Sequence, residues 1–278
     1  MLHSPYTQYK HLYVYHLDMM NIPAVDDPDL IGVWIEDNTA VLFFHKNKDA
    51  LVAKICHENG CEVIYQADLD YEDWEAGHQI SAFEAGSFTV APIWEKTDAD
   101  IVLDPSVIFG SGFHPTTRTC LQLVDKYAKT PELTINSMLD LGTGTGLLSI
   151  AAAKHGVKEI TAIDNNPLAC QVAQANCRYN HVEKHVSVQE ADLRNNPPQT
   201  KEVDLVVANL YRGLLEELFN RADFWQGNLY ILSGFIKSME ADLLAAIPAD
   251  KLRFLERTRK EQWCIWVIAP KDSLFLQS

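Results

Sequence analysis

The segment "MLDLGTGTGLLSIAAA", Met138–Ala153, has the pattern of a strand that enters a glycine-rich turn and continues as a helix. Its glycines occupy alternate positions, Gly142, Gly144 and Gly146. Glycine adopts positive φ without steric cost and lets the backbone approach a ligand closely. Turns of this kind open many nucleotide-binding sites at the end of a strand in a parallel sheet. The segment therefore predicts a site for a nucleotide-type ligand.

The spacing of the turn separates the classes of nucleotide. A dinucleotide fingerprint, G-x-G-x-x-G/A, needs a third small residue that packs the helix on its strand. That position is Leu147 when the motif is counted from Gly142 and Ser149 when it is counted from Gly144, and neither count fits well. A triphosphate-binding loop needs Gly-Lys-Ser/Thr, but Leu147 follows Gly146. A G-x-G-x-G turn after an acidic strand end, here Asp140, is typical of S-adenosylmethionine sites.

Strand and helix patterns alternate after residue 137. Strands are predicted at 137–141, 159–164, 186–190, 203–209 and 228–233, and helices at 147–155, 167–180, 213–225 and 238–246. Residues 251–270 have the pattern of a closing hairpin without a helix. This alternation predicts an α/β fold, with a doubly wound, mostly parallel, seven-stranded sheet and helices on both faces.

The first part of the chain follows a different pattern. We expect a strand at 11–17, a hairpin over 32–45 that turns at 36–39, a helix over 48–59 that ends at Gly60, and a strand at 61–69. The predicted organisation is a small, acidic α+β domain over 1–70, a connector rich in Trp and Gly over 71–100, and the nucleotide-binding domain over 101–278.

The charge is unevenly distributed. The net charge is −15, and residues 1–100 hold 18 acidic against 5 basic residues. An acidic surface repels nucleic acid and attracts basic proteins, although such a balance also serves solubility alone. The six cysteines form no Cys-x-x-Cys pair, so we expect reduced thiols, no metal site and a cytoplasmic protein. No apolar run is long enough to cross a membrane.

Two further acids follow predicted strands. Asp164 ends the strand after the glycine turn, where a carboxylate accepts hydrogen bonds from both ribose hydroxyls; nicotinamide enzymes share this feature. Asp192 follows the third strand and is placed to accept from an adenine amino group, unless it is an ordinary turn residue.

The segment "LDPSVIFGSGFHPTTRTCLQLV", Leu103–Val124, is the most unusual part of the chain. Its Phe109–Gly112 stretch cannot be regular structure, and Thr116, Thr117 and Thr119 then open a helix. Hydroxyls and free N–H groups at a helix start suit a carboxylate or another ligand oxygen, although a glycine-rich hinge before a capped helix has the same pattern. His114 is either a general base or a structural loop residue.

At this loop the chain resembles the PrmA-type ribosomal protein methyltransferases, which carry Leu-Asp-Pro-x-x-Ala-Phe-Gly-Thr-Gly-x-His-x-Thr-Thr. The resemblance continues in "DWE" at 73–75, "APIW" at 91–94, "LDLGTGTGLLSIAAAKHG", "AIDNNP", "VDLVVANL" and "ILSGF". It implies a class I enzyme of Rossmann-like fold that uses S-adenosylmethionine and methylates lysine side chains or an N-terminus of a basic protein, ribosomal large-subunit protein eleven in that family.

The resemblance and the residue patterns together give the candidate site. The candidate cofactor-binding residues are Phe109, Gly110, Thr117, Asp140, Gly142, Gly144, Gly146, Asp164, Asn165, Asp192 and Asn209. The candidate catalytic residues are His114, Thr116, Asn209 and the backbone of Leu210. Methyl transfer to an amine relies on orientation, and side-chain and carbonyl oxygens at these positions are suited to aim the amine N–H groups.

The segment after Asn209 bears on the acceptor. Methyltransferases that act on nucleobase or glutamine amino groups commonly have Asn-Pro-Pro-Tyr here, whereas this chain has "NLYRGL". The absence of the prolines favours an aliphatic amine. Tyr211 and Arg212 depart from the small or apolar pair usual in the family, and Arg212 is either a cation at the site or a solvent-facing helix residue.

The resemblance weakens in the first 70 residues. The family's ferredoxin-like N-terminal domain, which binds the substrate, has a helix after its first strand, but Pro23 and Pro28 make a long helix unfavourable here. This difference bears on the substrate and leaves the methyltransferase prediction intact. Three alternatives to a protein methyltransferase stay open on other grounds: an RNA or small-molecule methyltransferase, a catalytically silent binding module and a nicotinamide dehydrogenase.

Overall fold

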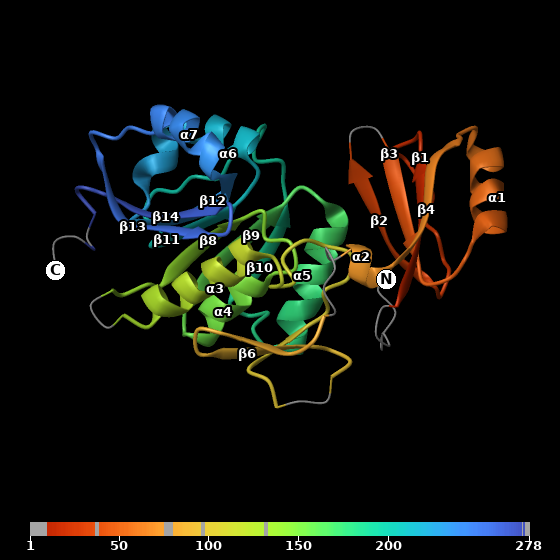
Figure 1. Cartoon of the computed structure of the whole chain (residues 1–278), viewed down its shortest axis with the longest axis horizontal. Helices are drawn as coiled ribbons and strands as arrows, with labels where there is room; N and C mark the ends of the chain where they lie inside the picture. The colour runs from red at the N-terminus through yellow and green to blue at the C-terminus, as the bar shows by residue number, and fades with distance from the viewer. Residues whose placement is uncertain are drawn as a thin grey trace.

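A computed structural model describes residues 10–36, 39–74, 80–95, 98–130, 133–273 and 275. The chain forms a large α/β body around a seven-stranded sheet and a smaller body around a four-stranded sheet, and α5 of the larger body lies between the two (Figure 1). The small four-stranded sheet covers residues 11–70 and is called the N-terminal sheet below.

The seven-stranded sheet has the strand order β10-β9-β8-β11-β12-β14-β13. All neighbouring pairs are parallel except β12–β14 and β13–β14, which are antiparallel. The order reverses between β8 and β11, so this is the topological switch point where ligands bind in open α/β sheets. The strands are β8 (Ser137–Leu141), β9 (Glu159–Asp164), β10 (Val186–Glu190), β11 (Leu205–Asn209), β12 (Leu229–Ile236), β13 (Leu252–Lys260) and β14 (Trp263–Pro270).

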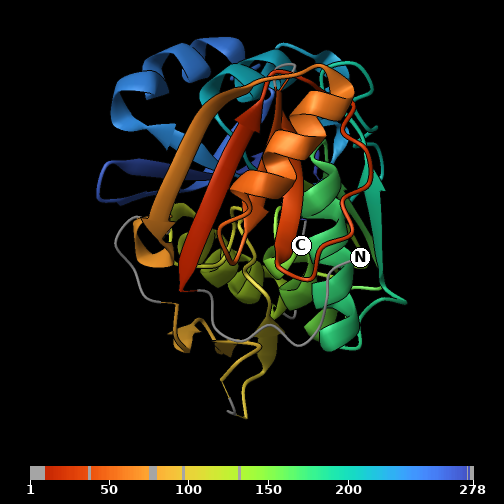
Figure 2. The ribbon, with the colours of Figure 1, turned by 90° about the vertical axis from the view of Figure 1, so that its right-hand side faces the viewer.

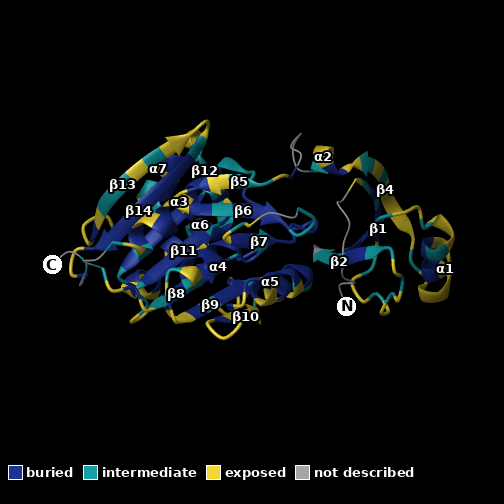
Figure 3. Cartoon of the chain, turned by 90° about the horizontal axis from the view of Figure 1, so that it is seen from below, coloured by how far each residue is buried: buried dark blue, intermediate teal, exposed yellow. Residues whose placement is uncertain are grey.

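Helices cover both faces of this sheet, and its central strands are buried, whereas the edge strands β10 and β13 keep exposed residues (Figure 3). One face packs on α3 and α4, and the other on α6, a 3₁₀ helix at Ala222–Gln226, and α7. Within the described residues no helix combines the length and the apolar character that a membrane span needs. The helices are α3 (Pro115–Ala128), α4 (Leu147–Lys154), α5 (Pro167–Tyr179), α6 (Arg212–Phe219) and α7 (Glu240–Ala246).

The predicted alternation is confirmed in order and closely in bounds. The strands at 137–141, 159–164 and 186–190 have the predicted ends, and the closing hairpin forms as β13 and β14. The Asn166 side chain caps α5 by accepting from the Leu168 N–H, with Pro167 at the first helical position. The helix predicted over 213–225 was too long, because α6 ends at Phe219 and a separate 3₁₀ turn follows.

The N-terminal sheet is antiparallel with the order β2-β3-β1-β4. Its helix α1 covers the face turned away from the large body (Figure 2) and ends at Gly60 in the left-handed conformation, as predicted. No helix forms between β1 and β2; Met19, Ile22 and Val25 of that loop pack on the α1 side of the sheet instead. The elements are β1 (His11–Leu17), β2 (Leu30–Glu36), β3 (Thr39–Phe44), α1 (Asp49–Asn59) and β4 (Val63–Asp70).

The segment expected to be a connector contains regular structure that was not predicted from the sequence. It holds a one-turn helix, α2 (Tyr71–Trp74), and two strands, β5 (Phe83–Ala85) and β6 (Phe88–Pro92). These strands form a three-stranded sheet with β7 (Ile101–Leu103), which pairs parallel to β6. Residues 37–38 of the expected turn and Glu75 of the "DWE" match lie outside the described residues.

Candidate functional site

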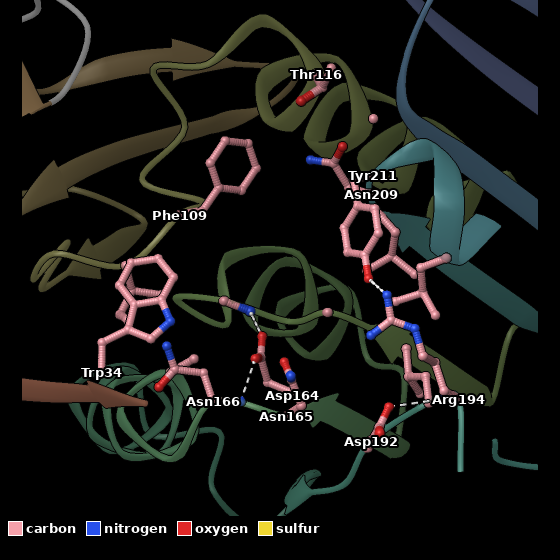
Figure 4. Close-up of a pocket in the computed structure, with 18 of the residues that line it drawn as sticks. Trp34, Phe109, Thr116, Asp164, Asn165, Asn166, Asp192, Arg194, Asn209 and Tyr211 are labelled. Atoms are coloured by element: carbon pink, nitrogen blue, oxygen red, sulfur yellow. Dashed lines mark hydrogen bonds between the residues drawn. The ribbon is translucent and has the colours of Figure 1, made fainter. Parts of the chain in front are cut away.

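A cleft of about 850 Å³ opens at the carboxyl ends of β8, β9 and β11 (Figure 4). Its volume lies in the range of small-molecule and cofactor sites. Ten of the candidate residues line it: Phe109, His114, Thr116, Gly142, Gly144, Asp164, Asn165, Asp192, Asn209 and Leu210. The cleft therefore forms at the switch point of the sheet, where the sequence placed it.

The glycine turn accepts no side chain at its first two glycines. Gly142, Gly144 and Gly146 all have positive φ, between 54° and 83°. A Cβ on Gly142 would lie 2.3 Å from the Leu210 side chain, and one on Gly144 would lie 2.2 Å from the Phe109 carbonyl oxygen. Packing of the turn against Leu210 and the Phe109 carbonyl therefore requires glycine at both positions, and both glycines line the cleft.

Two carboxylates hold this turn in different ways. Asp164, at the end of β9, accepts from the Gly144 N–H at 3.0 Å and from the Asn166 N–H at 3.0 Å while facing the cleft. Burial raises its pKa above the ordinary value, against the opposing effect of these N–H groups. Asp140 is fully buried and accepts from the hydroxyls of Thr143 at 2.8 Å and Ser149 at 2.6 Å. Asp140 therefore braces the turn from behind.

The loop before α3 closes the cleft beside this turn. The Thr145 hydroxyl donates to the Gly110 carbonyl at 2.7 Å, and the Thr145 N–H donates to the Phe109 carbonyl at 3.2 Å. The Phe109 ring is 51% exposed and points into the cleft (Figure 4). The loop thus contacts the turn through its carbonyl groups, and the Phe109 side chain lines the cleft.

His114 is the N-cap of α3. Its Nδ1 accepts from the Thr116 N–H at 3.3 Å and lies 2.7 Å from the Thr116 hydroxyl oxygen. Burial lowers the pKa of His114 below its ordinary value, and the nearby Glu261 charge opposes this effect. An acceptor at Nδ1 leaves the proton of the neutral ring on Nε2. The ring is then a hydrogen-bond donor at its second nitrogen, which is unfavourable for a general base.

Asn209 presents an unsatisfied acceptor. Its Nδ2 donates to the Thr117 hydroxyl at 3.3 Å, whereas its Oδ1 is buried and has no hydrogen-bond partner among the described residues. A buried polar atom without a partner costs about 1–3 kcal/mol. The Leu210 carbonyl, also expected to act here, lies against Gly234, where a Cβ would approach it to 2.0 Å. Asn209, which lines the cleft, therefore has a buried acceptor oxygen that the described residues leave without a hydrogen bond.

An ionic rim closes the far end of the cleft. The Asp192 carboxylate accepts from the Arg194 N–H at 2.9 Å, and the Arg194 guanidinium donates to the Tyr211 hydroxyl across the rim (Figure 4). Arg194 also pairs with Glu217 at 3.3 Å. Arg212 does not line the cleft; it pairs with Glu216 and Asp242 on the helix surface.

Four candidate residues do not line the cleft but contact groups that do. Thr117 accepts from Asn209, Gly110 accepts from Thr145, Asp140 holds the turn, and Gly146 begins α4 with Ala173 3.2 Å from where its Cβ would lie. Several lining residues were not predicted from the sequence. Arg194 and Tyr211 share the strand-end position of Asp192 and Asn209, so that position was an available indicator. The others are Met20, Trp34, Ile35, Ile108, Asn166, Ala169, Leu193, Leu214, Gly234 and Trp263.

Comparisons with known proteins agree with this architecture. The family model described as ribosomal protein L11 methyltransferase (PrmA) matches residues 25–271. The chain is 31% identical over 214 residues to the ribosomal protein L11 methyltransferase of Carboxydothermus hydrogenoformans, covering 73% of this chain and 68% of that protein. It is 31% identical over 282 residues to the protein of the same name from Herpetosiphon aurantiacus, covering 87% and 86%.

A solved structure shares the fold. The crystal structure of a ribosomal protein L11 methylase from Lactobacillus delbrueckii subsp. bulgaricus superposes with a TM-score of 0.59 at 24% identity, and covers 69% of this chain and 99% of that one. The resemblance found in the loop and turn motifs is thus confirmed over most of the length. The chain belongs to the ribosomal protein L11 methyltransferase (PrmA) family, a family of protein methyltransferases and therefore of enzymes.

Proposed function

We propose that this protein transfers a methyl group from S-adenosylmethionine to an amino group of a basic ribosomal protein, the homologue of the L11 protein named for its relatives. The single observation that carries the proposal is the buried, unpartnered Oδ1 of Asn209 in the cleft that the glycine turn forms. An acceptor oxygen at this place suits a donor such as an amine N–H.

The residues present fit the cofactor. Gly142 and Gly144 keep the turn free of side chains, and Asp164 turns a carboxylate to the cleft that suits ribose hydroxyls. Asp192 lies further along the same cleft, where it suits an adenine amino group. When bound, S-adenosylmethionine supplies a methyl group on a positively charged sulfur.

The chain's own residues orient the acceptor. Thr117 accepts from the Asn209 Nδ2 and so fixes the direction of the amide. Asn209 Oδ1 then accepts an N–H of the neutral amine, which leaves the nitrogen lone pair free to react. The amine nucleophile must be unprotonated, and the methylated product releases its extra proton to solvent, so a general base is not obligatory. Orientation of this kind supplies several kcal/mol of the barrier reduction.

The distribution of charge suits a basic partner. Residues 1–100 carry a net charge of −13, and Asp68 and Asp70 of β4 expose 58% and 73% of their side chains. This balance disfavours nucleic acid as a direct partner. We propose a cytoplasmic site of action, in keeping with a ribosomal substrate.

Transfer of labelled methyl groups tests the proposal. Purified protein is incubated with methyl-labelled S-adenosylmethionine and purified L11 protein from the same cell type, and the products are analysed by mass spectrometry. We expect labelled methyl groups on lysine side chains or the N-terminus of L11. The same incubation is made with a cell extract. Label in the RNA or small-molecule fraction of that extract, with L11 unlabelled in both incubations, would contradict the proposal.

A further inference from the structure

Three residues of the N-terminal part line a cleft that otherwise belongs to the large α/β body. Trp34 and Ile35 come from β2, and Met20 comes from the loop between β1 and β2. Trp34 lies beside Asn166, on the side of the cavity opposite Tyr211 and Arg194 (Figure 4). The N-terminal sheet therefore completes one wall of the cleft.

The position of this wall depends on how β2 packs against α5. Gly32 of β2 lies directly on Leu168, and a Cβ at Gly32 would lie 2.5 Å from the Leu168 Cδ1 atom. Leu168 is 2% exposed and belongs to a closed apolar cluster that joins the two bodies. Successive side chains of a strand alternate between faces, so Trp34, two residues beyond Gly32, faces the same side as this contact.

The cluster that joins the two bodies is drawn from both of them. Its buried members from the N-terminal sheet and α2 are Leu12, Val14, Ile31, Val41, Phe43 and Tyr71, and its buried members from the large body include Val107, Ile108, Leu168, Ala169 and Val172. A shared, buried apolar cluster holds the sheet in one orientation, because separating the two parts returns this surface to water. The wall of the cleft is thus placed by packing.

Trp34 combines an anchored ring with an available donor. Its ring packs edge-on against Trp74 at 6.4 Å and lies 6.3 Å from the Phe43 ring. The nitrogen-bearing edge of the indole faces the cavity (Figure 4), and in the described part of the chain the indole N–H donates to no acceptor. An indole N–H is a donor only, which suits the oxygen of a sugar hydroxyl.

We propose that Trp34 contacts the nucleoside part of the cofactor, so that cofactor binding and docking of the N-terminal sheet on α5 are coupled. The inference rests on the proposed function and extends it, because it assigns to the N-terminal part a role in cofactor binding as well as in recognition of a protein substrate. The proposed ligand is a nucleoside whose ribose lies at Asp164 and accepts a hydrogen bond from the Trp34 indole N–H.

Coupling of this kind is reciprocal. A ligand that contacts both bodies binds the docked arrangement more tightly than any other, and it stabilises docking by the same free energy. A substitution that disturbs docking at Gly32 should therefore weaken cofactor binding, although Gly32 does not line the cleft. Weaker binding in a Gly32 variant would indicate coupling between docking and cofactor binding, because Gly32 itself has no contact with the cleft to lose.

Calorimetric titration with S-adenosylhomocysteine tests the proposal on the full chain. We expect Trp34→Ala to weaken binding about tenfold, and Trp34→Phe, which keeps a ring but loses the N–H, to weaken it by a smaller factor. Gly32→Val should weaken binding about as much as Trp34→Ala. Tyr65→Ala is the matched control, because Tyr65 lies on the same sheet, is 57% exposed and does not line the cleft; its affinity should be unchanged.

The outcomes separate the two proposals. If the unmodified chain binds S-adenosylhomocysteine and all variants bind within twofold of it, Trp34 does not contact the cofactor. If the unmodified chain binds neither this ligand nor S-adenosylmethionine, the proposed function itself fails. Should Trp34→Ala not fold, Trp34→Phe still decides. Hydrogen exchange adds a second measurement: the ligand should slow exchange in β2 of the unmodified chain and less so in Trp34→Phe.

Discussion

Asn209 is the residue on which the proposed chemistry depends most directly. It ends β11 at the switch point of the sheet. Its amide N–H donates to the Thr117 hydroxyl, and its buried oxygen has no partner among the described residues. Neighbouring groups act on the shape of the cleft instead: Gly142 and Gly144 exclude side chains, and Asp140 braces the turn from its buried position. The groups that line the cleft, such as Asn209, are thus distinct from the groups that position the surrounding backbone, such as Asp140.

Replacing Asn209 with Ala should reduce kcat about 100-fold or more, because the acceptor that orients the amine is lost; loss of one preorganised hydrogen-bonding group at a reacting centre has effects of this size. Thr117→Val should reduce kcat about tenfold, because Thr117 acts through the Asn209 amide. Steady-state kinetics with L11 measures both. Equal activity of Asn209→Ala and the unmodified enzyme would show that the buried oxygen has no part in catalysis.

His114 gives a pH prediction with a defined direction. Burial lowers its pKa in the folded protein below the ordinary 6.5, so the neutral, capping form is favoured by folding. The corresponding stability is complete above about pH 6.5 and is lost as the pH falls through the lowered folded pKa. His114→Asn keeps an N-cap without this titration, so its stability should lack that acid-side loss.

Activity distinguishes capping from base catalysis at the same residue. We expect His114→Asn to keep kcat within about threefold, and His114→Ala to lower the free energy of unfolding by about 1 kcal/mol through loss of the cap. Thermal and urea unfolding at pH 7.5 and 5.5 measure the stability of each variant, and steady-state assays measure its kcat. A loss of several hundredfold in kcat for a well-folded His114→Asn would establish His114 as a base.

At the scale of elements, α5 connects the parts of the molecule. Leu168, near the start of α5, packs against Gly32 of β2 in the N-terminal sheet. Further along, Asn176 donates to the carbonyls of Asp104 and Thr145, each at 2.9 Å, and accepts from the Asp104 N–H at 2.8 Å. One buried amide thereby joins the loop before α3 to the glycine turn. Without the Asn176 amide, the backbone N–H and carbonyl of Asp104 and the carbonyl of Thr145 would each lose a hydrogen bond.

A second connection joins the β5–β6 hairpin to α3 and α4 through Asp125, which is 5% exposed. Its carboxylate accepts from the Ser87 hydroxyl at 2.5 Å and from His155 at 2.8 Å, and pairs with Lys129 at 2.9 Å. Burial acts to raise the pKa of Asp125, but the hydrogen bonds from Ser87, Lys129 and His155 outweigh it and the net pKa is lowered.

Asp125→Asn should lower the free energy of unfolding by about 2–3 kcal/mol at pH 7, because charge-assisted hydrogen bonds become neutral ones and one acceptor is lost. Since the folded pKa lies below the unfolded value of 3.8, this stabilisation is present above pH 3.8 and is lost as the pH falls through the folded pKa. Urea unfolding at pH 7 and pH 3 measures the difference, which should shrink at pH 3. A constant difference would show that the charge is not its source.

For the whole molecule, the two bodies differ in charge as well as in fold. Residues 1–100 have a net charge of −13, whereas residues 101–278 have a net charge of −2. The acidic part also forms one wall of the cleft through Met20, Trp34 and Ile35. A basic protein attracted to this part is thereby brought to the side of the molecule on which the cleft opens.

The KM for the L11 protein should rise severalfold between low salt and about 1 M salt, where the screening length falls to about 3 Å. The dissociation constant of S-adenosylhomocysteine, a ligand enclosed by the cleft, should change much less and provides the control. Initial rates at several salt concentrations measure the effect. A KM for L11 that does not change with salt would mean that the acidic part does not steer the substrate.

The sequence by itself determined the alternating strands and helices, the glycine turn, the cap of α5 and the loss of a helix at Pro23 and Pro28. These features follow from short-range rules: side-chain periodicity, positive φ at glycine, caps and the missing N–H of proline. The candidate residues at the strand ends followed too, because parallel strands end at one edge of a sheet.

The tertiary structure alone decided the contacts between segments distant in the chain. Asn209 forms a hydrogen bond with Thr117, and Asp125 forms hydrogen bonds with Ser87 and His155. Trp34 lines the cleft. Residues 83–92, expected within a connector, form the hairpin β5–β6, and β6 also pairs with β7. The contacts of Asn209, Asp125 and Trp34 arise from packing across long sequence separations, for which local patterns carry no information. The turn could therefore be recognised in the sequence, while the wall facing it could be found only in the folded chain.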